Sequence, residues 1–113
     1  MKVTKISRNM IEFTNGYKLY SDHSQSCCEL HYLSMADLTL ADFEGMEFDL
    51  LKDDFFNRIP NYGIELMPIN SHSVKIPGYG YNNGYYNSDI TLVVAKDGKV
   101  VKRYDVTNCQ KMM

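Results

Sequence analysis

Tryptophan, long apolar runs and an excess of either charge are all missing from this sequence. Its 113 residues include 12 Lys and Arg against 14 Asp and Glu, which gives a formal net charge of -2 at pH 7. A balance this close to zero provides no general attraction to nucleic acid or to an anionic membrane. No stretch approaches the roughly 20 apolar residues of a transmembrane helix. The opening segment, MKVTKISRNM, lacks the apolar core of a signal peptide. We therefore expect a cytoplasmic protein whose partners are neither membranes nor nucleic acids.

Cysteine is scarce as well. The chain has three, an odd number that does not suit a disulfide framework. Free thiols are the rule in a reducing compartment, so the count also favours the cytoplasm. A length of 113 residues with 44% hydrophobic side chains suits a single domain over residues 1–113. A core of that size needs neither a disulfide nor a metal to fold.

Helix signals are few, whereas turn signals recur at the spacing of β-strands. The segment MIEFTNGYKLY, residues 10–20, carries apolar side chains on both sides of Asn15-Gly16, a pair that favours type I′ hairpin turns. The segment ITLVVAKDGKVVKRYDV, residues 90–106, repeats this arrangement around Asp97-Gly98. CELHYL, residues 28–33, and YGIELMPI, residues 62–69, also have the composition of strands.

Two segments carry signals for short helices. In TLADFEG, Thr39 precedes Asp42 by three residues in the manner of a capping box, and Gly45 can end the helix. In DLLKDDFFNRIP, residues 49–60, apolar residues have helical spacing up to Pro60, although the overlapping MEFDLL alternates like a strand. These patterns predict an α+β fold, a mostly antiparallel β-sheet built from hairpins with one or two short helices.

The densest group of reactive side chains lies in SDHSQSCCELHY, residues 21–32. If residues 27–33 are a strand, Cys27, Glu29 and His31 share one face, and Cys28, Leu30 and Tyr32 share the other, which resembles core. Thiolate, carboxylate and imidazole all bind zinc, and His23 could add a fourth ligand. Alternate residues of a strand lie nearly 7 Å apart, however, and no CxxC or HxxxH spacing is present. We therefore interpret the segment as an ordinary polar face, with a metal site at His23, Cys27, Glu29 and His31 as the alternative. We predict no cofactor.

A second unusual segment is IPGYGYNNGYYNSD, residues 76–89, where tyrosines alternate with glycines. Tyrosine offers a large contact area at a low entropic cost, so such a segment is typical of a recognition surface. No basic residue accompanies the rings, which argues against nucleic acid as the partner. The alternative is a tight hairpin at Asn83-Gly84 with the rings covering a sheet edge. The candidate binding residues are Tyr79, Tyr81, Tyr85 and Tyr86.

Acidic residues are also concentrated, with nine in residues 22–54 against the single Lys52. Such a region can dock on a basic partner or imitate phosphates. It can equally be a solvated surface that is neutralised in part by the basic segment over residues 96–111 of the same chain. The candidate binding residues here are Asp42, Glu44, Glu47 and Asp49.

Several of these features together resemble a domain-of-unknown-function family of small phage and bacterial proteins (DUF7448-like). In that family a hairpin leads into a Cys-Cys-Glu strand, which an acidic loop and a short helix follow. The resemblance assigns no catalytic residues. It implies a small intracellular phage or prophage accessory protein that binds a host protein, and inhibition of host defence is one version of that role. The positions that carry it are Gly16, Cys27, Cys28, Glu29, Gly45, Gly84, Tyr85 and Tyr86.

These observations favour a non-enzymatic protein-binding module. Its partner would be a host protein or a second copy of the chain, because an open sheet edge offers a template for a homodimer. The alternative function is a small metal-binding protein or enzyme that uses the segment with Cys27, Glu29 and His31.

Overall fold

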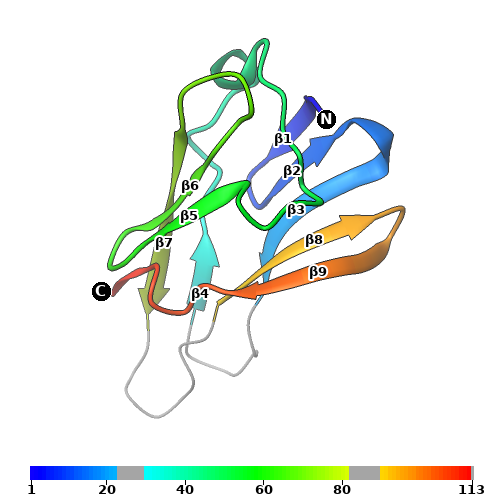
Figure 1. The fold of residues 1–113 in the computed structure, drawn as a ribbon. Helices are drawn as coiled ribbons and strands as arrows, with labels where there is room; N and C mark the ends of the chain where they lie inside the picture. The colour runs from blue at the N-terminus through cyan, green and yellow to red at the C-terminus, as the bar shows by residue number, and fades with distance from the viewer. Residues whose placement is uncertain (23–29, 82–89, 113) are drawn as a thin grey trace.

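The structure, a computed structural model, describes residues 1–22, 30–81 and 90–112. Within these residues the chain forms two β-sheets and two single 3₁₀ turns, η1 (Thr14–Gly16) and η2 (Leu40–Phe43) (Figure 1). The strands are β1 (Val3–Ser7), β2 (Met10–Phe13), β3 (Tyr17–Asp22), β4 (Leu30–Leu33), β5 (Phe56–Ile59), β6 (Gly63–Leu66), β7 (Val74–Tyr81), β8 (Thr91–Lys96), β9 (Lys99–Asp105) and β10 (Lys111–Met112).

The predicted α+β class is wrong, and the fold is all-β. In the described residues the regular structure is almost entirely strand, and neither of the two described 3₁₀ helices exceeds four residues. The expected short helix near residues 40–44 is present as the four-residue 3₁₀ helix η2. Its start is as predicted, since the Asp42 carboxylate accepts a hydrogen bond from the Thr39 N–H at 2.8 Å. Gly45 follows at a φ of 76°, which ends the turn before a helix can extend.

The second expected helix, over residues 49–60, is absent. Asp49 accepts a hydrogen bond from the Leu51 N–H at 3.1 Å, which closes a local turn in place of a helix start. Aspartate side chains compete in this way for backbone N–H groups, and this segment contains three of them. Beyond the turn, Phe56–Ile59 forms β5 and pairs antiparallel with β6. Cross-strand pairing therefore decides the structure of a segment whose apolar spacing favoured a helix.

The first sheet has the strand order β1-β2-β3-β8-β9, and every neighbouring pair is antiparallel. Both hairpins predicted from the turn residues are confirmed. Asn15 and Gly16 have φ values of 64° and 78°, and Asp97 and Gly98 have values of 52° and 85°. Only residues that tolerate positive φ can fill such turns, which is why these dipeptides were informative.

The second sheet is organised around β7. Its first half pairs antiparallel with β6, which pairs in turn with β5. Its second half pairs antiparallel with β4, through Leu30–Leu33, and parallel with the short β10. Three segments that are far apart in the sequence are thus brought together along one strand.

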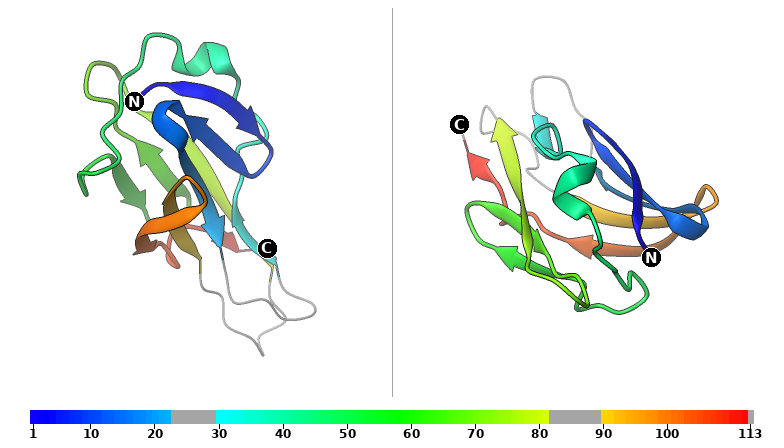
Figure 2. Two further views of the ribbon diagram at one scale, coloured as in Figure 1. Left: turned by 90° about the vertical axis from the view of Figure 1, so that its right-hand side faces the viewer. Right: turned by 90° about the horizontal axis from the view of Figure 1, so that it is seen from above.

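The hydrophobic core lies between the two sheets, which form separate layers (Figure 2). Leu19, Leu92 and Val94 of the first sheet and Ile64 and Ile76 of the second are fully buried. The connection after η2 runs from the top of the molecule down one side to β5 (Figure 1), and its buried rings Phe48 and Phe55 belong to this core. In the described parts of the chain, no helix is long and apolar enough to cross a membrane.

Candidate functional site

The predicted metal ligands fall mostly outside the described residues. His23, Cys27 and Glu29 lie in the segment 23–29, and His31 belongs to β4, where its backbone pairs with Gly80. Over residues 1–22, 30–81 and 90–112, no group of three or more His, Cys, Asp or Glu is placed to hold a metal ion. The metal interpretation of residues 21–32 therefore stays a prediction.

Of the four candidate tyrosines, the structure describes the side chain of Tyr79. Tyr81 ends β7 and its backbone pairs with Leu30, whereas Tyr85, Tyr86 and the proposed Asn83-Gly84 turn lie outside the described residues. Tyr79 is half-buried and belongs to a larger aromatic surface that its own segment did not reveal.

This surface, which we call the tyrosine row, consists of Tyr32, Tyr79, Lys111 and Tyr62. Tyr32 on β4 is the cross-strand partner of Tyr79, and the centroids of the two rings lie 5.7 Å apart. On β10, Lys111 is in register with Tyr79. The Lys111 Nζ atom lies 4.6 Å from the centroid of the Tyr62 ring and 5.5 Å from that of Tyr79. All three rings are half-buried, so each keeps part of its surface in contact with solvent.

Two glycines allow the segments that carry the tyrosine row to come this close. A Cβ atom on Gly63 would lie 2.7 Å from the Gly78 nitrogen and would also clash with the carbonyl oxygen of Ile76. A Cβ atom on Gly78 would clash with the carbonyl oxygen of Cys109. The backbones of β6, β7 and the segment before β10 therefore touch. This contact places side chains from residues 62, 79 and 111 on one surface.

Sequence reasoning missed Tyr32, Tyr62 and Lys111 as members of this surface. Tyr32 and Tyr62 each belonged to a segment with the composition of a strand, residues 28–33 and 62–69. Neither pattern shows which strands are neighbours. The parallel pairing of β10 with β7 joins residues more than thirty positions apart, and no local signal predicts it.

The acidic candidates have partners within the chain. The Glu47 carboxylate binds the ammonium group of Met1 at 3.1 Å and lies 3.7 Å from the Lys2 Nζ atom. Asp42 caps η2 and Asp49 closes the turn that follows, as described above. Glu44 is exposed, and no hydrogen bond or ion pair of its carboxylate is found in the described residues. These contacts favour a structural role for most of the acidic residues.

A clamp of Asp53, Lys102 and Tyr104 joins the acidic segment to the basic strand β9. The Asp53 carboxylate accepts hydrogen bonds from Lys102 at 2.9 Å and from Tyr104 at 2.7 Å. The bond from Lys102, followed by that from Tyr104, lowers the pKa of Asp53. Burial and the bond to Asp53 raise the pKa of Tyr104. Lys102 also donates to the Leu51 carbonyl at 2.5 Å, so the clamp fixes the connection before β5.

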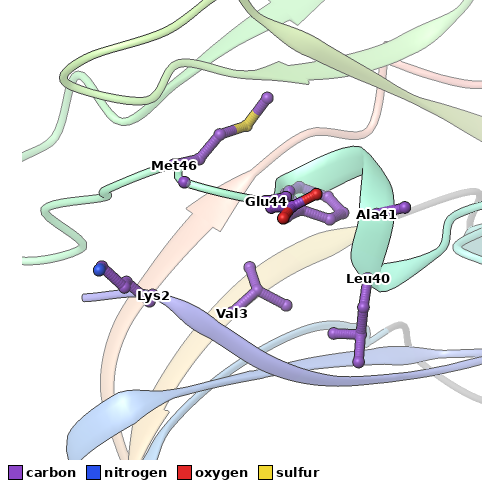
Figure 3. A pocket seen from close by; sticks show the side chains of 8 residues that line it. Lys2, Val3, Leu40, Ala41, Glu44 and Met46 are labelled. Carbon is purple, nitrogen blue, oxygen red and sulfur yellow. The ribbon is translucent and has the colours of Figure 1, made fainter.

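One hollow opens near the acidic candidates, between β1 and η2 (Figure 3). It has a volume of about 320 Å³ and is lined by Val3, Leu40, Phe43 and Met46, with Lys2 and Glu44 among its polar residues. Phe43 and Met46 are buried, whereas 52% of the Leu40 surface is exposed. Because Lys2 and Glu44 carry opposite charges, the hollow shows no preference for a charged partner.

No family model, no curated protein and no solved structure matches this chain. The resemblance to a domain-of-unknown-function family therefore stays a prediction, and the functional argument below depends on the geometry of the tyrosine row.

Proposed function

We propose that this chain is a non-enzymatic protein-binding module and that the tyrosine row is its contact surface. The observation that carries the proposal is the proximity of three half-buried tyrosine rings from β4, β7 and the turn before β6. Tyrosine is enriched among the residues that dominate binding energy, because one ring buries a large area and its hydroxyl group keeps a hydrogen bond.

The scaffold supports this role through its rigidity. Tyr32 and Tyr79 are on paired strands, and the N–H of Gly78 donates to the carbonyl of Tyr62 at 2.7 Å. The backbone positions that carry these rings are therefore held in place by the sheet itself. A surface that loses little conformational entropy on binding keeps more of its contact energy as affinity.

The sequence resemblance supports a biological context for this proposal. It suggests a phage or prophage accessory protein whose partner is a host protein, with inhibition of a defence system as one version. A second copy of the chain is the other partner class that the hairpin-rich sequence suggested.

The test is quantitative affinity capture from a bacterial lysate, followed by titration of the purified partner. We expect a specific partner whose affinity falls roughly 30-fold or more in Tyr79→Ala, as for an interface residue worth about 2 kcal/mol. Tyr20→Ala is the matched control, because Tyr20 is a half-buried tyrosine in the other sheet. Thermal unfolding of both variants checks that they fold. Equal retention of the partner by Tyr79→Ala and Tyr20→Ala would refute the proposal.

A further inference from the structure

Lys111 occupies an unusual position in the tyrosine row. Its ammonium group lies over two aromatic rings, at 4.6 Å from the Tyr62 centroid and 5.5 Å from the Tyr79 centroid. Both distances are within the range of about 6 Å in which a cation is attracted to the face of a ring. In the part of the chain that the structure describes, no carboxylate forms an ion pair with Lys111. The two rings are thus the partners that hold this cation.

We propose that Tyr62 and Tyr79 form a binding site for the methylated ammonium group of a partner's lysine, and that Lys111 fills this site in the free protein. The inference deepens the proposed function, on which it rests, by naming the chemical group that the tyrosine row recognises. The side chain of Lys111 shows directly that an ammonium group fits between the two rings.

Lys111 can leave the site without disturbing the rings. Its side chain is exposed, and β10 contains two residues. The segment before it is held independently, since Cys109 is 1% exposed and the N–H of Asn61 donates to the carbonyl of Asn108 at 2.9 Å. Displacement of Lys111 therefore needs only a rotation of its side chain into solvent. An exposed cation–π contact is weak enough for a competing ligand to replace it.

The composition of the site favours a methylated ammonium group over an unmodified one. A primary ammonium group is strongly hydrated and donates three hydrogen bonds, which two ring faces cannot replace. A trimethylated group donates none and presents apolar methyl groups, so it loses little on leaving water. Aromatic rings without a carboxylate partner are suited to such a cation.

The experiment is a titration of the full chain with Nε-trimethyl-lysine amide, followed by the NMR signals of the tyrosine rings. Lysine amide and norleucine amide are the controls for methylation and charge. We expect trimethyl-lysine to bind more tightly than lysine and norleucine to cause no shift. In Lys111→Ala the affinity should rise roughly two- to fivefold, because the internal competitor is removed.

Variants of the ring make the inference falsifiable. In the Lys111→Ala background, Tyr79→Ala should abolish binding, whereas Tyr79→Phe, which keeps the ring and its packing, should retain it. Tyr20→Ala, on the other sheet, should have no effect. An unchanged affinity in Lys111→Ala, or binding that survives Tyr79→Ala, would overturn the inference.

Two further outcomes separate this inference from its alternatives. Binding to phosphocholine vesicles without binding to trimethyl-lysine would overturn it in favour of a lipid headgroup. If Tyr79→Ala loses the captured partner while the titration shows no trimethyl-lysine binding, the inference fails and the proposed function stands. If the titration succeeds but no partner depends on Tyr79, the proposed function fails and the ammonium site remains.

Discussion

Replacement of Gly63 by alanine should test whether close backbone contact builds the tyrosine row. A Cβ atom at this position would lie 2.7 Å from the Gly78 nitrogen and 2.8 Å from the Pro77 Cα atom, and it would also clash with the Ile76 carbonyl oxygen. All three neighbours are backbone atoms of β7, which cannot rotate away as a side chain can. Strands β6 and β7 must therefore separate to admit one methyl group.

The expected destabilisation follows from these contacts. Overpacking of a tight interior costs about 1–3 kcal/mol, and we expect the upper end because rigid backbone surrounds the site. For a domain of this size, that loss corresponds to a fall of roughly 10 °C in the melting temperature. Urea denaturation gives the free energy of unfolding, and circular dichroism gives the melting temperature.

Gly45→Ala is the matched control for this prediction. Gly45 has a φ of 76°, but no atom lies within 4 Å of the position its Cβ atom would take. The Gly45→Ala variant should therefore lose only roughly 1–2 kcal/mol of stability, which is the cost of holding an alanine in the left-handed conformation. The trimethyl-lysine titration should weaken in Gly63→Ala and stay unchanged in Gly45→Ala. A Gly63→Ala protein as stable as the wild type would show that β6 and β7 are not in close contact, and the geometric basis of the tyrosine row would fail.

Three other predictions concern ionisation and the cysteines. The hydrogen bonds from Lys102 and then Tyr104 hold the pKa of Asp53 below its ordinary value of 3.8. They therefore stabilise the fold above that pH, and this stabilisation is lost as the pH falls through the lowered pKa. Urea denaturation should therefore show a steeper loss of stability in acid for the wild type than for Asp53→Asn, and parallel curves would contradict the clamp. Burial raises the pKa of the Cys109 thiol. Peptide mapping should therefore find that Cys109 is alkylated slowly in the native protein and rapidly in urea. Equal alkylation rates would show that Cys109 is exposed. Elemental mass spectrometry of the purified protein should find no stoichiometric metal, whereas zinc or iron that is lost in Cys27→Ser and His31→Ala would establish the alternative function.

The sequence predicted the local features of the fold well. Asn15-Gly16 and Asp97-Gly98 located two hairpins, because positive φ is a property of the residues themselves. The capping pair Thr39 and Asp42 is formed as expected, and it begins the four-residue 3₁₀ helix η2. Helical spacing over residues 49–60 was misleading, because the period of a short apolar run cannot distinguish a helix from a turn followed by a strand.

The candidate site was predictable only in part, for a different physical reason. Tyr79 was identified from its composition, since tyrosines between glycines suggest a contact surface. Its partners Tyr32, Tyr62 and Lys111 come from three other segments, and their meeting depends on which strands flank β7. Strand order is set by packing of the whole core, which no short pattern encodes.

The glycines of β7 connect its local sequence with the segments that pack beside it. In the sequence, Gly78 and Gly80 are two of the glycines that alternate with tyrosines in residues 76–89. In the structure both belong to β7, and Gly78 is a point of close approach between backbones. A glycine within a strand removes a side chain that would otherwise keep neighbouring segments apart. The two residue types in β7 thus have complementary roles. The missing side chain of Gly78 lets the segment before β10 approach, and the ring of Tyr79 then contacts Lys111 of β10.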